Sequence, residues 1–400
     1  MASLLVRNAR IHGSGAVDVE VEDGRISAVR AAGSVHDWES VVDAQGALLL
    51  PTLVDGHCHP DKTAWDEPWV SRQPAATLEE LIANDVLLQR SFATPVRTRA
   101  ERLLGAYVAA GARAVRAHVD VAPVYGLDNI RGVVEAADAL ADALHVEVVA
   151  FPQLGVMRTP GTAELMRESV AAGATVIGGI DPGGLDGDLH GQLDTVFGLA
   201  IELGVSLDIH LHDGGEHGMG QVREIIRRTH DAGLEGRVAI GHAFCYSDCD
   251  DAQLTALGEA TAAAGITLAT CALGDSPVLP VARLQELGCR VVLGSDGVRD
   301  AWSPFGNGNM LDRTHLLAWR TGAVTDAELE ACLDVAAHAG ADFLGLERSG
   351  LRVGDPADFM LVPGEVPAQV VIDRPLPHYV FRAGRVVARD GALTAIPATF

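Results

Sequence analysis

The sequence predicts an α/β protein, a (β/α)8 TIM barrel that carries a small β-sandwich domain formed by both chain termini. Eight segments typical of buried strands alternate with helical segments between residues 53 and 296, as expected for such a barrel. The chain ends instead show short strands separated by turn residues. We therefore assign residues 52–351 to the barrel and residues 1–51 plus 352–400 to the terminal domain.

Both ends of the chain have the pattern of half-buried strands, with apolar and polar residues in alternation. Near the N-terminus this pattern covers residues 4–13, 16–29 and 41–50, and near the C-terminus it covers residues 351–362, 378–391 and 392–396. Asp23-Gly24 predicts a hairpin turn inside the second of these segments. Because the two chain ends share this alternating pattern and the middle of the chain does not, we expect the ends to form a single domain.

The barrel strands are predicted from short apolar runs. They are residues 53–59, 114–121, 146–153, 175–181, 206–212, 238–243, 266–272 and 290–296. Residues 97–112, 161–174 and 251–266 are examples of the intervening helical segments, several of which end in Ala-Gly or Leu-Gly, a common helix stop. An open doubly wound sheet is the alternative fold, but no strand is followed by the GxGxxG motif of that class.

Composition narrows the range of partners. The chain holds 54 acidic and 30 basic residues, a net charge of −24, which disfavours nucleic acids and anionic membranes and leaves neutral or cationic small molecules. Six cysteines in 400 residues are too few for a disulfide scaffold. The N-terminus lacks the pattern of a signal peptide, and no apolar run is long enough to span a membrane. We expect a cytoplasmic protein with reduced thiols.

Lys62 is the only lysine among the 30 basic residues. In a chain that otherwise uses arginine, a retained lysine predicts a position that needs a compact ammonium group. Its ammonium could bind a substrate carbonyl oxygen or stabilise developing negative charge. The alternative is a salt bridge to Asp61, Asp66 or Glu67.

Polar side chains gather at the predicted carboxyl ends of the barrel strands. They are His57 and His59, His118 and Asp120, Gln153, His210 and His212, His242, and Asp296. In a parallel barrel these ends lie on one face, where barrel enzymes place their active sites. His57 and His59 are two residues apart on a strand, so both imidazoles can face one ion. His118 and Asp120 are expected to orient a metal-bound histidine.

Several imidazoles and a carboxylate suit Zn²⁺ or Fe²⁺ better than Mg²⁺ or Ca²⁺. A water bound to such an ion has its pKa lowered to about 7, so it supplies hydroxide at neutral pH. The sequence therefore predicts a hydrolytic metal centre at the mouth of the barrel.

Seven motifs together resemble the amidohydrolase superfamily, in particular its cytosine deaminase branch and the N-isopropylammelide amidohydrolase relatives. The motifs are GHCHPDKT (56–63), RAHVDV (116–121), VVAFPQLG (148–155), DIHLHD (208–213), GHAFCYSD (241–248), GSDGVRDAWSPFGNGNM (294–310) and GDPADFMLV (354–362). The resemblance implies one divalent metal, Zn²⁺ or Fe²⁺, with His57, His59, His210 and Asp296 as its ligands. The predicted strand 175–181 has no lysine that could bridge a second metal.

The resemblance also implies roles near the metal. His242 would orient the attacking water, Gln153 would hydrogen-bond the heterocycle, and Trp302 would lie near the ring pocket. Asp296 would accept the proton of the water. Cytosine deaminases have a glutamate at the position of Asp213, which is one methylene shorter.

We therefore predict hydrolytic deamination of an amino-substituted nitrogen heterocycle. Asp213 and His212 are expected to act together in delivering a proton to the leaving amine, and either of them could be the essential donor. Gly297 stands where cytosine deaminases carry a second acidic residue, so extra space and a ring other than cytosine are expected. Substituted pyrimidines, s-triazines and pterins are the candidates. Arg299 and Asp300 could recognise the substrate or form a salt bridge, and of the two we expect the salt bridge.

Three alternatives stay open at this point. The same scaffold could remove an alkylamine or open a cyclic amide. These reactions share the metal chemistry, and the shape of the binding pocket determines which substrate reacts. A non-catalytic heterocycle-binding protein is the weakest alternative, because all the ligand-type residues are present. Fold-level analogy alone suggests a homo-oligomer.

Overall fold

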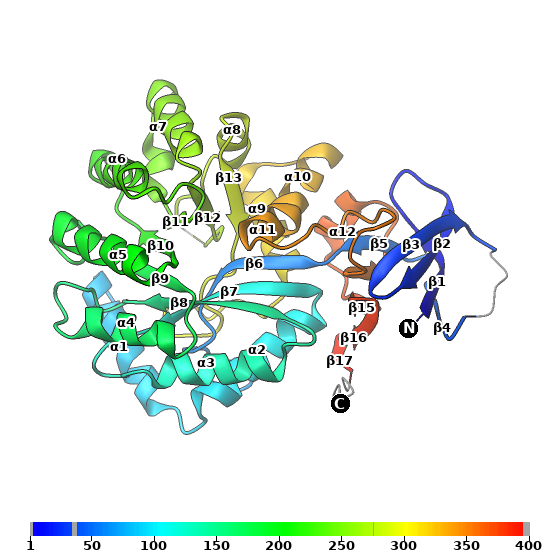
Figure 1. The fold of residues 1–400 in the computed structure, drawn as a ribbon, viewed down its shortest axis with the longest axis horizontal. Helices are drawn as coiled ribbons and strands as arrows, with labels where there is room; N and C mark the ends of the chain where they lie inside the picture. Colours follow the sequence, from blue (N-terminus) through cyan, green and yellow to red (C-terminus); the bar gives the residue numbers. More distant parts are fainter. Residues whose placement is uncertain (1–2, 34–37, 275, 395–400) are drawn as a thin grey trace.

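The computed structural model describes residues 3–33, 38–274 and 276–394, and its centre is an eight-stranded parallel sheet that curves into a barrel (Figure 1). The strands are β6 (Leu53–Cys58), β7 (Ala112–Asp120), β8 (His145–Phe151), β9 (Val176–Ile180), β10 (Ser206–Leu211), β11 (Val238–His242), β12 (Thr267–Thr270) and β13 (Arg290–Leu293). They lie side by side in chain order. A parallel bridge between Cys58 and Asp296 links the two edges. The predicted barrel is confirmed, with each strand a little shorter than expected at its carboxyl end.

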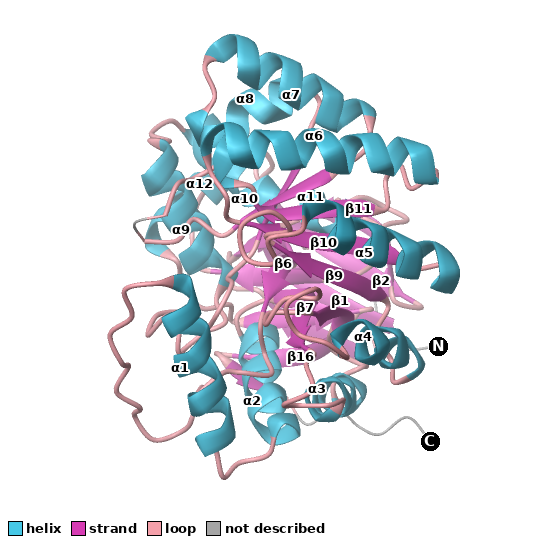
Figure 2. Cartoon of the chain, turned by 90° about the vertical axis from the view of Figure 1, so that its left-hand side faces the viewer, coloured by secondary structure: helices cyan, strands magenta, loops and turns pink. Residues whose placement is uncertain are grey.

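Helices cover the outside of the barrel (Figure 2). They are α1 (Leu78–Ser91), α2 (Val96–Ala109), α3 (Asp128–Ala139), α4 (Thr162–Ala171), α5 (Leu189–Leu203), α6 (Gly215–Ala232), η1 (Phe244–Asp248), α7 (Asp251–Ala263), α8 (Val281–Glu286), α9 (Met310–Thr321), α10 (Asp326–Ala336) and α11 (His338–Phe343). A capping box between Asp250 and Gln253 starts α7. Gly204, in the left-handed region at φ 69°, ends α5 in front of β10.

Burial on both faces of the strands explains their apolar sequences. All nine residues of β7 are buried, as expected for a parallel sheet with side chains packed inside and helices outside. The packed interior holds the strands in place, so the residues that follow each strand are fixed at one end of the barrel. That end carries the predicted polar residues.

Both chain ends form a second, mixed sheet next to the barrel (Figure 1). Its strands are β1 (Ser3–Arg10), β2 (Ala16–Glu22), β3 (Arg25–Ala31), β4 (Ser40–Asp43), β5 (Leu48–Pro51), β14 (Phe359–Val362), β15 (Tyr379–Arg382), β16 (Arg385–Arg389) and β17 (Ala392–Leu393), with helix α12 (Pro367–Asp373) between β14 and β15. Hydrogen bonds join these nine strands, contributed by both chain ends as predicted, into one mixed sheet. The predicted strand at 392–396 lies partly outside the described residues.

The terminal sheet has its own small core and is tied to the barrel by buried charges. Phe359 and Phe381 pack with ring centres 4.7 Å apart. The buried Arg113 of β7 donates to the Asp358 carboxylate at 2.9 Å, next to β14. The predicted Asp23-Gly24 hairpin turn is present between β2 and β3, with φ of 50° and 76°. Among the described helices, none is both long and apolar enough to cross a membrane.

Candidate active site

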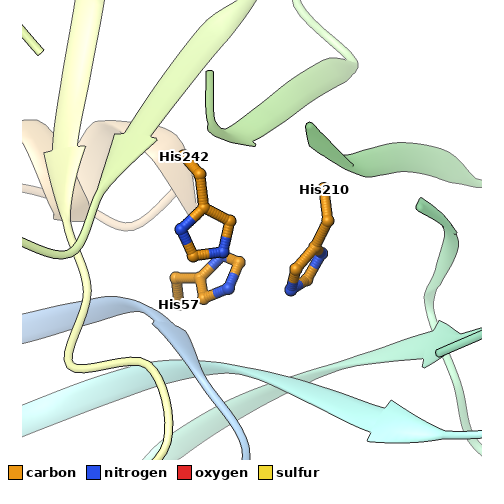
Figure 3. A group of neighbouring side chains, drawn as sticks. All are labelled: His57, His210 and His242. Atoms are coloured by element: carbon orange, nitrogen blue, oxygen red, sulfur yellow. The ribbon is translucent and has the colours of Figure 1, made fainter. Parts of the chain in front are cut away.

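Four residues predicted as metal ligands come together at the carboxyl end of the barrel. His59 Nε2 lies 3.2 Å from Asp296 Oδ1 and 3.4 Å from His210 Nε2. His57 Nε2 lies 3.9 Å from the same Asp296 oxygen. His242 is close to this group, and Figure 3 shows its ring beside those of His57 and His210. Residues scattered over the chain thus place several imidazoles and one carboxylate around one point.

The backbone at the strand ends sets this convergence. His57 and His59 flank Cys58 at the end of β6, and the buried Cys58 thiol instead donates to the Arg116 carbonyl at 3.5 Å. The Asp296 N–H donates to the His57 carbonyl at 2.8 Å. His242 and Asp296 have left-handed φ of 64° and 61°, a conformation that is costly for residues other than glycine. The surrounding structure holds them there and turns their side chains inward.

Burial keeps the imidazoles neutral. It lowers the pKa of His57 and His210 well below the ordinary value, and neighbouring histidines lower it further. For the same main reason the pKa of His59 falls to about 3 and that of His242 to about 4. Burial raises the pKa of Asp296, but the His59 hydrogen bond and nearby His242 outweigh it and bring this pKa well below its usual range.

These groups fit a divalent metal. Within the described chain, both ring nitrogens of the buried His57 and the Nδ1 atoms of His210 and His242 have no hydrogen-bond partner, an arrangement that is costly unless another group binds them. Ligand atoms of His57, His210 and His242 lie within 4.8 Å of one another, as do those of His57, His59 and Asp296. Neutral imidazoles with a carboxylate are ligands that Zn²⁺ and Fe²⁺ accept.

A second layer orients the histidines. His59 Nδ1 lies 3.1 Å from the His118 carbonyl, which directs the opposite nitrogen of the ring toward Asp296. The His118 ring lies 4.0 Å from that of His57, and its Nε2 is 3.4 Å from Asp208 Oδ1. The expectation that His118 orients a metal-binding histidine therefore has a geometric basis. Asp120 differs, because its carboxylate contacts Lys62 instead.

A small cavity adjoins the histidine cluster. Eight predicted site residues line it, namely His59, Lys62, Gln153, His210, His212, His242, Asp296 and Trp302. Phe151, Ile180 and Asp300 complete the lining. His57 is fully buried next to the cavity. The ring of Phe151 stacks on that of His210 with centres 4.0 Å apart, which adds an apolar wall suited to a flat ring.

The two candidate proton donors occupy different places. His212 faces the cavity, stacks on His242 with ring centres 4.4 Å apart, and shares a 2.7 Å hydrogen bond between its Nδ1 and Asp181 Oδ2. Burial lowers the pKa of His212, but the Asp181 carboxylate raises it more, so this pKa lies above the ordinary value. Asp213 is absent from the cavity lining, and its Oδ2 accepts hydrogen bonds from the Gly184 N–H at 2.9 Å and Gln221 Nε2 at 2.7 Å.

Lys62 lies at the centre of a buried polar network. Its Nζ donates to Asp120 Oδ1 at 3.2 Å and to Gln153 Oε1, and it lies 3.9 Å from Asp85 Oδ2. Asp120 and Asp85 thus replace the three acidic residues considered from the sequence. Gln153 Nε2 donates to Asp85 at 2.6 Å, so the amide predicted to bind the heterocycle is held at both ends.

Sequence reasoning missed Asp181, Asp85 and Gln89. Asp181 follows β9, so the rule that selected the other strand-end residues would have found it. Asp85 and Gln89 lie one turn apart on α1 and point inward, where Gln89 donates to Asp85 at 3.0 Å and to Asp120 at 2.8 Å. Two polar residues at this spacing on a helix carry no signal that separates a buried face from an exposed one.

The expectation of extra space at Gly297 is wrong. A Cβ on Gly297 would overlap Asp300 Oδ2 and lie 2.7 Å from Asp300 Cγ, so the Asp300 carboxylate already fills that space. The expected salt bridge of Arg299 with Asp300 is absent from the described part of the chain, where Arg299 instead stacks over the Trp65 ring at 4.8 Å. Trp302 lies nearby as predicted, with Lys62 Nζ 5.8 Å from its ring centre.

Comparisons with known proteins agree with this site. A model of the amidohydrolase family matches residues 71–388. The chain is 30% identical over 408 residues to the N-isopropylammelide isopropyl amidohydrolase of Pseudomonas sp. (strain ADP), with 98% of each chain covered. The structure of N-isopropylammelide isopropylaminohydrolase from Burkholderia multivorans matches with a TM-score of 0.94 and 35% identity, covering 98% of this chain and 100% of that one.

A further solved structure, 5-methylcytosine deaminase from Klebsiella pneumoniae liganded with phosphonocytosine, matches with a TM-score of 0.83 and 25% identity. It covers 99% of this chain and 100% of that one. The resemblance inferred from the motifs is confirmed, and the histidine-rich centre is the metal-binding site typical of such enzymes. The chain belongs to the amidohydrolase family and is a metal-dependent hydrolase of carbon–nitrogen bonds of the heterocycle type.

Proposed function

We propose that this enzyme hydrolyses the bond between a ring carbon of a nitrogen heterocycle and an exocyclic amino group, so that the ring gains a carbonyl and an amine leaves. The observation that carries the proposal is the His212–Asp181 pair beside the metal-binding cluster. It places a protonatable imidazole at the edge of the same cavity, 4.4 Å from the His242 ring. A hydrolase that expels an amine needs such an acid.

Several residues at the cavity have roles in this reaction. A divalent metal held by His57, His59, His210 and Asp296 would supply hydroxide at neutral pH. Asp296 takes the proton of the attacking water, and His242 orients that water. His212, charged with the help of Asp181, donates a proton to the departing nitrogen.

Asp213 has no part in this scheme, because its carboxylate is bound to Gly184 and Gln221 outside the cavity. The remaining lining holds the ring. Phe151 and Trp302 offer flat faces, and Lys62 offers a cationic donor. In this scheme the imidazoles and Asp296 carry out the reaction, and the residues on the opposite wall of the cavity bind the ring.

Removal of an alkylamine is the second candidate for the leaving group. The two relatives named for N-isopropylammelide match almost the whole chain at 30% and 35% identity, which supports an alkylamino-substituted s-triazine. The match to a 5-methylcytosine deaminase supports ammonia as the leaving group. Both reactions use the same atoms of this chain.

A substrate screen tests the proposal. Protein loaded with Zn²⁺ or Fe²⁺ is incubated with N-isopropylammelide, 5-methylcytosine and pterin, and ammonia, isopropylamine and ring absorbance are followed. We expect turnover of at least one compound, lost on chelation and restored by metal. The control is the metal-loaded Asp181→Asn variant, which should bind metal normally and turn over slowly. A metal-replete enzyme that releases no amine from any of the three would contradict the proposal.

A further inference from the structure

The Asp300 carboxylate stands beside the metal ligand Asp296, in the space that a side chain at Gly297 would occupy. A Cβ on Gly297 would overlap Oδ2 of Asp300, so the two features are coupled: only glycine at 297 allows this placement. Asp300 lines the cavity and is fully buried. The chain therefore keeps an acidic group at this wall, but supplies it from a position three residues further along.

The carboxylate is fixed at one oxygen and unpartnered at the other. Asp300 Oδ1 accepts hydrogen bonds from the Trp302 N–H at 2.9 Å and the Ser303 N–H at 2.8 Å. Oδ2 is buried and has no hydrogen-bond partner in the described part of the chain. Burial raises the pKa of Asp300 to about 7, and the nearby Asp85 carboxylate adds to the rise. Above this pH Oδ2 is a buried acceptor without a partner, and such an acceptor calls for a donor from a ligand.

Lys62 provides the complementary group on the same cavity. Of its three N–H donors, one goes to Asp120 and one to Gln153. Asp85 Oδ2 is 3.9 Å away, beyond hydrogen-bond distance, so a third donor is left for a ligand. The ammonium also lies 5.5 Å from the Phe151 ring centre and 5.8 Å from that of Trp302, so it sits at the edge of the aromatic walls. A flat ring between these walls meets one donor and one acceptor at its rim.

We propose that Asp300 is a specificity-determining residue whose Oδ2 accepts a hydrogen bond from a ring N–H, while Lys62 donates to the neighbouring ring carbonyl. The site would then select heterocycles with a lactam edge, –NH–C(=O)–, within the reaction proposed above, on which this inference rests. Rings that present only acceptor nitrogens, such as 6-aminopurines with a substituted N9, would leave Oδ2 unpaired and bind weakly.

Two isomeric ring compounds test the lactam edge directly. Both ring nitrogens of 5,6-dimethyluracil carry hydrogen, whereas 1,3-dimethyluracil has the same atoms but no N–H. Binding of each to the zinc-loaded protein is measured by calorimetry. We expect the N–H isomer to bind about 10-fold to 100-fold more tightly. Equal binding of the two isomers, or binding of neither, would overturn the proposal.

Asp300→Asn and Gly297→Ala assign that preference to the carboxylate. In Asp300→Asn the N–H groups of Trp302 and Ser303 hold the amide oxygen at the Oδ1 position, which turns the NH₂ group toward the ring. A donor then faces a donor, and the preference for the N–H isomer should disappear. Gly297→Ala displaces the carboxylate without changing any polar group and should have the same effect.

Matched controls are Asp128→Asn on the exposed start of α3 and Gly198→Ala on α5, where an added Cβ meets nothing within 4 Å. Bound zinc and melting temperature are measured for every variant. If Asp300→Asn or Gly297→Ala fails to fold, the isomer preference of the other variant tests the role of Asp300. Unchanged isomer preference in a folded, zinc-loaded variant would overturn the role of Asp300. If the isomer preference holds but the amine-release screen finds no turnover, the proposed reaction fails and the recognition role stands.

Discussion

Gly241 offers a way to disturb the proposed metal centre without touching any ligand. It lies on β11 inside the barrel, one residue before His242, and faces the His57 ring. An alanine in its place adds one methyl group to this contact. Gly241 has no side chain that could bind the metal, so any change in metal affinity in the alanine variant must come from a shift of the His57 imidazole.

The structure gives the size of the disturbance. A Cβ on Gly241 would lie 2.8 Å from His57 Cε1 and 3.1 Å from Nδ1, and ordinary contacts begin at 3.4 Å. The ring must then shift by about 0.6 Å, several times the tolerance of a metal–nitrogen bond. It has little room, since the rings of His118 and His210 lie 4.0 Å and 4.4 Å from it. We expect Gly241→Ala to weaken zinc binding about 10-fold to 100-fold.

Zinc affinity is measured on metal-free protein by competition with a chromophoric chelator, together with urea unfolding of the same samples. Gly198→Ala is the matched control and should bind zinc as the wild type does. The reasoning would be refuted by a Gly241→Ala protein of normal stability that binds zinc with unchanged affinity, because the His57 ring would then not contribute to the metal site.

Four further predictions follow. Asp181→Asn removes the charge that raises the pKa of His212, so the alkaline limb of the kcat–pH profile should move to lower pH; an unmoved limb would count against His212 as the acid. Asp213→Asn should change kcat by less than about threefold in the same assay. Lys62→Met leaves buried carboxylates uncompensated and should lower the free energy of unfolding by about 3–5 kcal/mol in urea titrations. Burial raises the pKa of Asp300 to about 7, so the wild type loses stability as pH rises from about 4, where the unfolded carboxyl ionises, to about 7. Asparagine does not ionise, so in urea unfolding the stability of Asp300→Asn relative to wild type should be greater at pH 8 than at pH 5.

The fold and the gathering of polar residues at one end of the barrel could be predicted from the sequence because both depend on local periodicity, whereas the set of metal ligands was implied by the family resemblance. Apolar runs of strand length mark the barrel, and the residue type at the end of each run marks the site. His57 and His59 share a face because side chains in a strand alternate, and a parallel barrel brings the ends of β6, β10 and β13 together whatever lies between them.

The polar network around Lys62 could not be predicted in this way, because it depends on how separate elements pack. Asp85 and Gln89 reach Lys62 and Asp120 only because α1 presents that turn to the barrel, and the register of a helix against a sheet is decided by packing. Gly297 was misjudged for the same reason. A missing side chain predicts space only if no neighbour fills it, and the neighbour here is Asp300, three residues along a loop of irregular backbone.

Lys62 connects the composition of the chain to this packing. Four buried carboxylates, those of Asp61, Asp85, Asp120 and Asp300, raise the pKa of the Lys62 ammonium, although burial opposes them. The pocket around it already holds Gln153 at hydrogen-bond distance, and Lys62 is 1% exposed. A guanidinium is wider and has five donors in a fixed plane, so it would need partners in directions that the walls of this pocket do not provide. The single lysine of an arginine-rich chain therefore lies where a compact cation must fit among carboxylates.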